Sequence, residues 1–197
     1  IYELFSDFNW DEQVFFRFGK QGAAWGLSRF YQIADPLSVA VKNPEDPSAD
    51  LEGPLAARIS LPLGVHTLYA YAVLKDSYLP QNPADASITD VGVGLKADFL
   101  VSVPENSFIG NGEVSLGSYY QKELAPKFVA SYSTGIKEVQ IFTDQVLSWG
   151  LDSYRLKENS LDTEKPEDEL FWSCTLGAMY VNNDWHFSAY GEYLYNG

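Results

Sequence analysis

The sequence contains little cysteine, methionine or histidine, and few basic residues. The single cysteine, Cys174, excludes an internal disulfide and a cysteine-based zinc cluster. Only 13 lysines and arginines stand against 27 aspartates and glutamates, which gives a formal charge of −14, and the basic residues are not gathered in one patch. A chain of this charge is repelled by phosphate backbones, so we expect no nucleic-acid partner.

Long apolar runs are also missing. The longest, such as 99–103, fall far short of the roughly 18 to 20 residues that a membrane-spanning helix needs. A mean hydropathy of −0.18 does not decide between a soluble protein and a membrane β-barrel, because alternate residues of a barrel face water. The sequence therefore excludes helical membrane topology but leaves other membrane folds open.

Aromatic residues and glycine are abundant: 12 phenylalanines, 13 tyrosines, 5 tryptophans and 15 glycines favour strands and turns. The clearest strand pattern lies at 90–103, where apolar residues alternate with polar or small ones. We expect Val91, Val93, Leu95, Phe99 and Val101 to face lipid, and Lys96 and Asp98 to face a lumen or another polar wall.

Similar patterns predict about ten strands, at 14–18, 23–31, 55–61, 65–75, 90–103, 108–120, 128–136, 138–149, 170–181 and 185–195. Short connections, expected at 20–22, 63–64, 104–107, 135–137 and 182–184, alternate with longer polar ones at 32–53, 76–89, 121–127 and 150–169. This alternation is typical of an up-and-down outer-membrane barrel, with tight turns at one end and long loops at the other.

One short segment resembles a pattern found in several families of large porin-like outer-membrane barrels. It reads Gly-Lys-Gln-Gly-Ala-Ala-Trp-Gly at 19–26, followed by Asp-Pro-Leu at 35–37, and covers roughly a tenth of the chain. The resemblance implies a fold and a location, but no substrate.

Several aromatic residues lie near the ends of the predicted strands. Such positions are typical of the aromatic girdles at membrane interfaces. We assign Trp25, Tyr78, Tyr120, Trp149, Trp172 and Trp185 to this role. For Trp25 the alternative is an ordinary core tryptophan of a soluble β-sandwich.

No catalytic constellation emerges. His66 and His186 lack a partner at metal-ligand spacing, and Cys174 has no activating neighbour. The acidic loop residues lack the spacing of an EF-hand, so we expect no metal site there. Since no catalytic motif is found either, we also expect no cofactor and no enzyme activity. These acids include Asp46, Asp50, Glu52, Glu164, Glu167, Asp168 and Glu169.

Polar residues on the expected wet face form the candidate site. In a barrel they would line the lumen and set its preference for solute charge, whereas in a sandwich they would be merely a solvated face. The candidates are Arg17, Arg58, Lys96, Asp98, Asn111, Glu113, Glu138, Gln140, Asp144 and Glu192.

The sequence thus predicts an all-β, antiparallel, up-and-down transmembrane β-barrel in a bacterial outer membrane, with 1–197 as one barrel domain or a fragment of one. We expect a porin-like channel or transport scaffold that passes small solutes, narrowed by inward folding of 32–53 or 150–169. Five tight turns would leave both chain ends on the long-loop side, so we expect an interior piece of a larger barrel. Membrane lipid and small solutes are the expected partners, and a homo-oligomer or surface partner proteins stay open. The alternative is a secreted or periplasmic carbohydrate-binding β-sandwich with acidic, calcium-binding loops.

Overall fold

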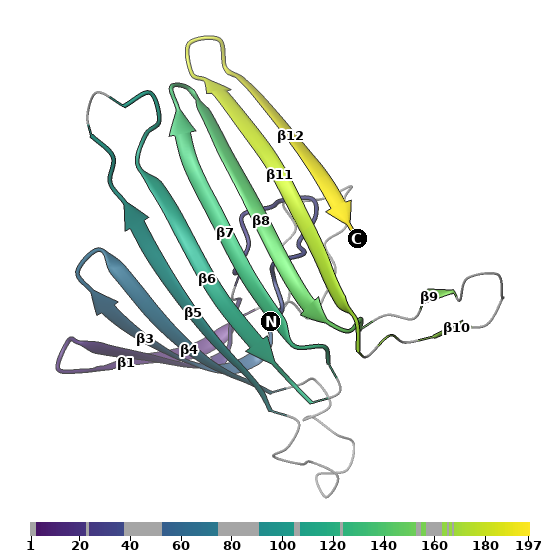
Figure 1. The fold of residues 1–197 in the computed structure, drawn as a ribbon. Coiled ribbons are helices and arrows are strands. Elements are labelled where there is room, and N and C mark those ends of the chain that lie inside the picture. Colours follow the sequence, from purple (N-terminus) through teal and green to yellow (C-terminus); the bar gives the residue numbers. More distant parts are fainter. Residues whose placement is uncertain are drawn as a thin grey trace, which may run out of the picture.

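A computed structural model describes residues 3–22, 24–37, 53–74, 91–104, 107–122, 124–152, 155–156, 163–164, 166 and 168–197. These residues form strands and no helices (Figure 1). In chain order the strands are β1 (Leu4–Trp10), β2 (Val14–Lys20), β3 (Leu55–Leu63), β4 (His66–Leu74), β5 (Gly92–Val101), β6 (Gly112–Tyr120), β7 (Lys127–Ile136), β8 (Val139–Trp149), β9 (Arg155–Leu156), β10 (Thr163–Glu164), β11 (Leu170–Asn182) and β12 (Phe187–Asn196).

Ten of these strands form one antiparallel sheet in the order β1-β2-β3-β4-β5-β6-β7-β8-β11-β12. Each strand pairs with its neighbour in the chain, except that the separate ribbon of β9 and β10 lies between β8 and β11. The prediction of an all-β, antiparallel, up-and-down arrangement of ten strands is confirmed. The sheet is not closed into a barrel, because β1 and β12 form its two edges and do not pair with each other.

The predicted strand at 23–31 is wrong, and so is the predicted tight turn at 20–22. Residues 24–31 belong to no strand and lie in the long connection between β2 and β3. The tenth strand is instead β1, which reaches β2 through a turn with Asp11 and Glu12 at φ of 53° and 55°. This turn contains no glycine, so the usual sequence signal for positive φ is absent.

The connections gather at opposite ends of the sheet. Tight turns at 11–13, 64–65, 137–138 and 183–186 lie at one end, and the strand ends that flank the longer connections 21–54, 75–91 and 150–169 lie at the other (Figure 1). Two connections depart from the predicted contrast in length: 102–111 is longer than expected at the tight-turn end, and 121–126 is short at the long-connection end.

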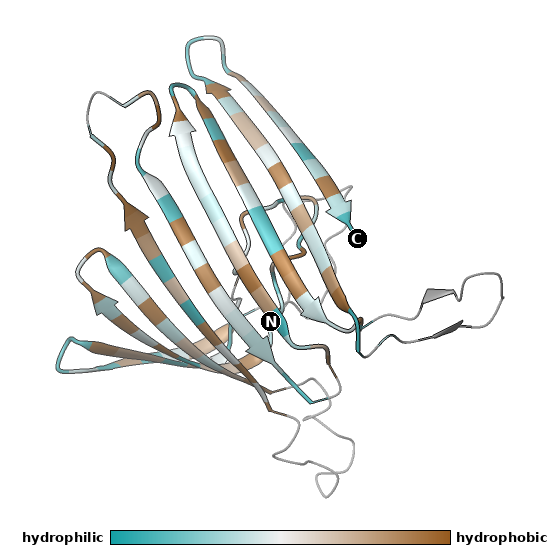
Figure 2. Ribbon diagram, in the orientation of Figure 1, coloured by the Kyte–Doolittle hydropathy of each residue, from teal (hydrophilic) through white to brown (hydrophobic). Residues whose placement is uncertain are grey.

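The two faces of the sheet differ in chemistry. Successive side chains of a strand point to opposite faces, so the strand register assigns every strand residue to one of them. We call the face that contacts residues 21–37 the inner face. Every Asp, Glu, Lys or Arg in the ten strands of this sheet except Lys20 lies on it: Asp7, Arg17, Arg58, Lys96, Asp98, Glu113, Lys127, Asp144 and Glu192. Polar and apolar bands accordingly alternate along the strands in Figure 2.

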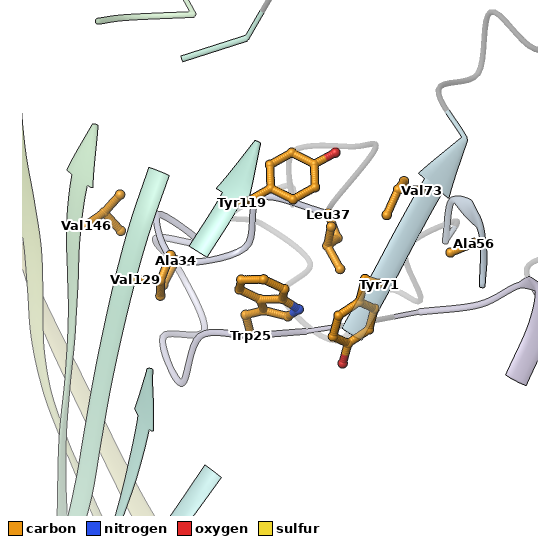
Figure 3. Close-up of a cluster of buried hydrophobic side chains, with 9 residues drawn as sticks. All are labelled: Trp25, Ala34, Leu37, Ala56, Tyr71, Val73, Tyr119, Val129 and Val146. Carbon is orange, nitrogen blue, oxygen red and sulfur yellow. The ribbon is translucent and has the colours of Figure 1, made fainter. Parts of the chain in front are cut away.

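The hydrophobic core lies between the inner face and the inner segment, which we define as residues 21–37. Trp25, Ala34 and Leu37 of this segment pack against inner-face residues of β3, β4, β6, β7 and β8 (Figure 3). The sheet residues of this cluster are Ala56, Tyr71, Val73, Tyr119, Val129 and Val146. Because these residues all lie in the half of the sheet nearer the long connections, the inner segment occupies that half.

Candidate functional site: the inner face and its segment

Trp25 is the centre of the contact between the inner segment and the sheet. Its side chain is 2% exposed, and its ring centroid lies 5.5 Å from that of Tyr71 and 6.5 Å from that of Tyr119. A Cβ atom at Gly94 or Gly117 would approach the indole ring to 3.0 Å or 2.6 Å, respectively. Glycine at these two strand positions therefore creates the space that the tryptophan fills.

Asp144 on β8 binds the backbone of the inner segment. Its carboxylate accepts hydrogen bonds from the backbone nitrogens of Leu27, at 3.0 Å, and Ser28, at 2.9 Å, and from Ser28 Oγ at 2.6 Å. Ser28 Oγ also lies 2.5 Å from Thr175 Oγ1 on β11. Asp144 and Thr175 are both 0% exposed. The buried carboxylate of Asp144, on the sheet, thus receives its hydrogen bonds from the inner segment.

Glu192 on β12 repeats this arrangement for the next residues of the segment. Its carboxylate accepts hydrogen bonds from the backbone nitrogens of Arg29 at 3.1 Å, Phe30 at 3.3 Å and Tyr31 at 2.9 Å. Tyr190 donates its hydroxyl hydrogen to Glu192 Oε2 at 2.5 Å. Five successive N–H groups, at 27–31, thus point at two wall carboxylates, an anion-binding arrangement of the backbone.

Aromatic packing holds Tyr190 beside Glu192. The Tyr190 ring stacks on Phe142 with centroids 5.6 Å apart, and Phe30 of the inner segment contacts it edge-on at 5.2 Å. A Cβ at Gly177 would lie 2.1 Å from the Phe142 ring, so glycine there lets this aromatic residue lie flat against the wall. The segment is therefore fixed on β12 by both hydrogen bonds and ring contacts.

Basic side chains lie on the opposite part of the inner face, on β2, β3 and β5, and those on β2 and β5 pair with carboxylates. Arg17 forms a bidentate pair with Asp7, with both N–O distances at 2.7 Å. Lys96 pairs with Asp98 at 3.0 Å, and Ser115 donates to the same carboxylate at 2.6 Å. Arg58, by contrast, has a buried Nε atom without a hydrogen-bond partner.

The sheet brings most of the predicted lumen residues onto one face. Arg17, Arg58, Lys96, Asp98, Glu113, Gln140, Asp144 and Glu192 all lie on the inner face, as the register of the sheet requires. Asn111 precedes β6 and accepts a hydrogen bond from the Val103 nitrogen, while Glu138 lies in the turn between β7 and β8. Val93, Leu95, Phe99 and Val101 lie on the outer face, opposite Lys96 and Asp98; Val91 precedes β5.

The assignment of Trp25 to the interfacial aromatic residues has to be corrected. It is buried on the inner face, because Gly94 and Gly117 leave room for it there. Tyr120, Trp149 and Trp172 lie on the outer face near the long-connection end and are 55%, 54% and 47% exposed. Trp185 is exposed in the turn between β11 and β12, and Tyr78 lies outside the described residues.

The sequence did not identify several residues of the site, namely Ser28, Tyr71, Thr175 and Tyr190. Neutral residues gave no charge signal, and the partners of Ser28 lie 116 and 147 positions away in the chain. Only the glycines at inner-face positions of β5 and β6 could have indicated from the sequence that a large side chain packs there.

The remaining reactive residues do not assemble into a site. His66 accepts a hydrogen bond from the Leu100 nitrogen at 3.3 Å, His186 lies in a turn, and Cys174 is half-buried on the outer face. Within the described part of the chain, no three His, Cys, Asp or Glu side chains are grouped to hold a metal. The predicted acidic loop residues Asp46, Asp50, Glu52 and Glu167 lie outside it.

Comparison with protein-family models, curated proteins and solved structures finds no match for this chain. The similarity of 19–37 to porin-like barrels therefore stays a prediction. The described residues contain no helix that is long and apolar enough to cross a membrane.

Proposed function

We propose that this chain forms part of the wall of a β-barrel in a bacterial outer membrane. The barrel acts as a porin-like channel or transport scaffold for small solutes and has no catalytic step. Its inner face lines the lumen, the inner segment narrows one half of it, and the unpaired edges of β1 and β12 pair with further strands. Solutes diffuse along the remaining polar wall, where fixed charges select among them.

The main support for this proposal is the chemistry of the outer face. Its strand residues are apolar or uncharged from β1 to β12, apart from Lys20 at the end of β2. Large side chains on it are widely exposed, for example Leu95 at 63%, Leu116 at 49%, Phe128 at 63% and Leu176 at 56%. Soluble monomers rarely expose contiguous apolar patches beyond a few hundred Å², and lipid is the partner that covers such a face on all strands at once.

The aromatic residues of the outer face support the same assignment. Tyr120, Trp149 and Trp172 lie toward one end, and Tyr180 and Phe187 lie toward the other with ring centroids 6.4 Å apart. Trp172 and Tyr180 are eight positions apart on β11, which is about 26 Å along a strand, or roughly 20 Å across a membrane at a barrel's tilt. That spacing is comparable to the apolar band of about 25 Å on outer-membrane barrels.

The carbohydrate-binding sandwich receives no such support. A sandwich buries one face of each of two stacked sheets, whereas the described residues form a single large sheet whose outer face is uncovered.

Arginine scanning at different depths tests the proposal. We expect Leu116→Arg, in the middle of β6, to lower the free energy of unfolding in lipid vesicles by about 2 to 4 kcal/mol. Val93→Arg, level with Tyr120 by register, should lower it by only about 0 to 1 kcal/mol. Spin labels at Leu95 and Lys96 should favour oxygen and aqueous relaxant, respectively. Equal costs at both depths, or equal accessibility of both labels, would contradict a lipid-facing outer surface.

A further inference from the structure

A cavity on the inner face lies away from the inner segment. It measures about 440 Å³ between β1, β2, β3 and β4, within the range of about 300 to 1,000 Å³ that is typical of small-molecule sites. Its lining includes Asn9, Arg17, Arg58, Ser60 and Tyr69, and no residue of the inner segment. The cavity therefore remains open beside the part of the wall that the segment covers.

The two arginines of this cavity face each other directly across β2 and β3. Arg17 and Arg58 are register partners, and like charges in directly opposite positions destabilise a sheet. Asp7, which also lines the cavity, is the bidentate partner of Arg17 and attracts Arg58 without an ion pair, so a single carboxylate stands against two guanidinium groups. In a chain with a formal charge of −14, this local excess of positive charge requires an explanation.

Arg58 differs from Arg17 in its hydrogen bonding. Its Nε atom is buried and has no hydrogen-bond partner, although its side chain also forms a hydrogen bond with Tyr71. No carboxylate of the described residues forms an ion pair with it. A buried charged donor without an acceptor is costly, and such groups in native structures commonly serve a function. The planar guanidinium presents a fork of donors that matches the two oxygens of a carboxylate.

We infer that this cavity binds the carboxylate of a small organic anion, with the guanidinium of Arg58 as the bidentate donor. Ser60 and Asn9 supply further polar contacts, and the rings of Phe15 and Tyr69 contact the apolar part of the solute. The inference rests on the proposed function, because the inner face is accessible to solutes only if it lines a lumen. Small organic carboxylates are then the class of solute that the channel selects.

Benzoate titration tests this site, with saturation-transfer NMR on the protein folded in detergent micelles and empty micelles as the blank. We expect saturable binding of benzoate and at least tenfold weaker binding of benzamide, its neutral analogue. Arg58→Gln should weaken benzoate binding at least tenfold, and Arg58→Lys, which keeps the charge but loses the fork, should fall between the two. Lys122→Gln, at an exposed position in the 121–126 connection, removes the same charge and should change nothing.

Equal effects of Arg58→Gln and Lys122→Gln, or equal binding of benzamide and benzoate, would overturn the inference. If Arg58→Gln does not fold, Arg58→Lys and the comparison of the two ligands decide the question. Conductance of the same preparations in planar bilayers separates the two proposals. A protein that conducts without Arg58-dependent benzoate binding refutes only the site, and one that binds benzoate in this way without conducting refutes the channel.

Discussion

Replacement of Asp144 by asparagine should release the inner segment from the wall. The aspartate carboxylate accepts hydrogen bonds from three donors, namely the nitrogens of Leu27 and Ser28 and the hydroxyl of Ser28. Hydrogen bonds to a charged partner contribute about 1.5 to 3 kcal/mol each, and neutral ones about 0.5 to 1.5 kcal/mol. Since asparagine keeps the size but loses the charge, each bond weakens by about 1 kcal/mol, and docking of the segment weakens by about 3 kcal/mol.

That loss corresponds to roughly a 100-fold shift in the equilibrium between docked and undocked segment. Hydrogen exchange of the amides at 27–31, measured on the protein folded in detergent, reports the shift directly. We expect these amides to exchange roughly 100-fold faster in Asp144→Asn. Trp25, which is buried with the segment, should become accessible to acrylamide quenching.

Asp98→Asn is the matched control for this experiment. Asp98 is another inner-face carboxylate, but it is held by Lys96 and Ser115 rather than by the inner segment. Its replacement should leave the exchange of 27–31 unchanged. If Asp144→Asn also leaves this exchange unchanged, or if Asp98→Asn accelerates it equally, the anchoring role of Asp144 is wrong.

Three further predictions concern the same wall. Glu192→Gln should accelerate exchange at 29–31 more than at 27–28, because Glu192 accepts only the later amides; a uniform change along 27–31 would contradict this. Gly117→Ala should cost about 1 to 3 kcal/mol in urea unfolding because its Cβ meets the Trp25 ring, whereas Gly191→Ala, with open space around the Cβ, should be tolerated; similar losses for both would refute the packing argument. Asp7→Asn should strengthen benzoate binding by freeing Arg17 while leaving stability nearly unchanged, since the pair is partly exposed; weaker binding would argue against an anion site.

The sequence predicted the local part of the fold well. On β5 the strict alternation of apolar and polar residues gave the correct strand and correctly set Lys96 against Leu95. This succeeded because a period of two is a property of neighbouring residues, and a shift of one position would reverse every side chain. The same pattern assigned Arg17, Asp144 and Glu192 to one face.

The number of strands was right through two errors that cancel. The aromatic stretch at 23–31 resembles a strand, but its amides bind Asp144 and Glu192 instead of a neighbouring strand. No local pattern reveals partners that are more than 100 positions away in the chain. The strand at 4–10 was not counted among the ten predicted strands, because the turn after it uses Asp11 and Glu12 at positive φ rather than glycine.

The structure also separates two roles that charge on the inner face can play. Asp144 is buried and Glu192 is half-buried, and both have donors from the inner segment on their oxygens, so their charge is compensated where a solute would pass. Arg58 forms no ion pair with a carboxylate of the described side chains, and Glu113 is exposed on β6. If this wall discriminates among solutes, Arg58 and Glu113 provide charge that no ion pair offsets, while the carboxylates of Asp144 and Glu192 fix the shape of the passage. The two acids that bind the inner segment are therefore its anchors, and solute selection would fall to the other charged residues of the face.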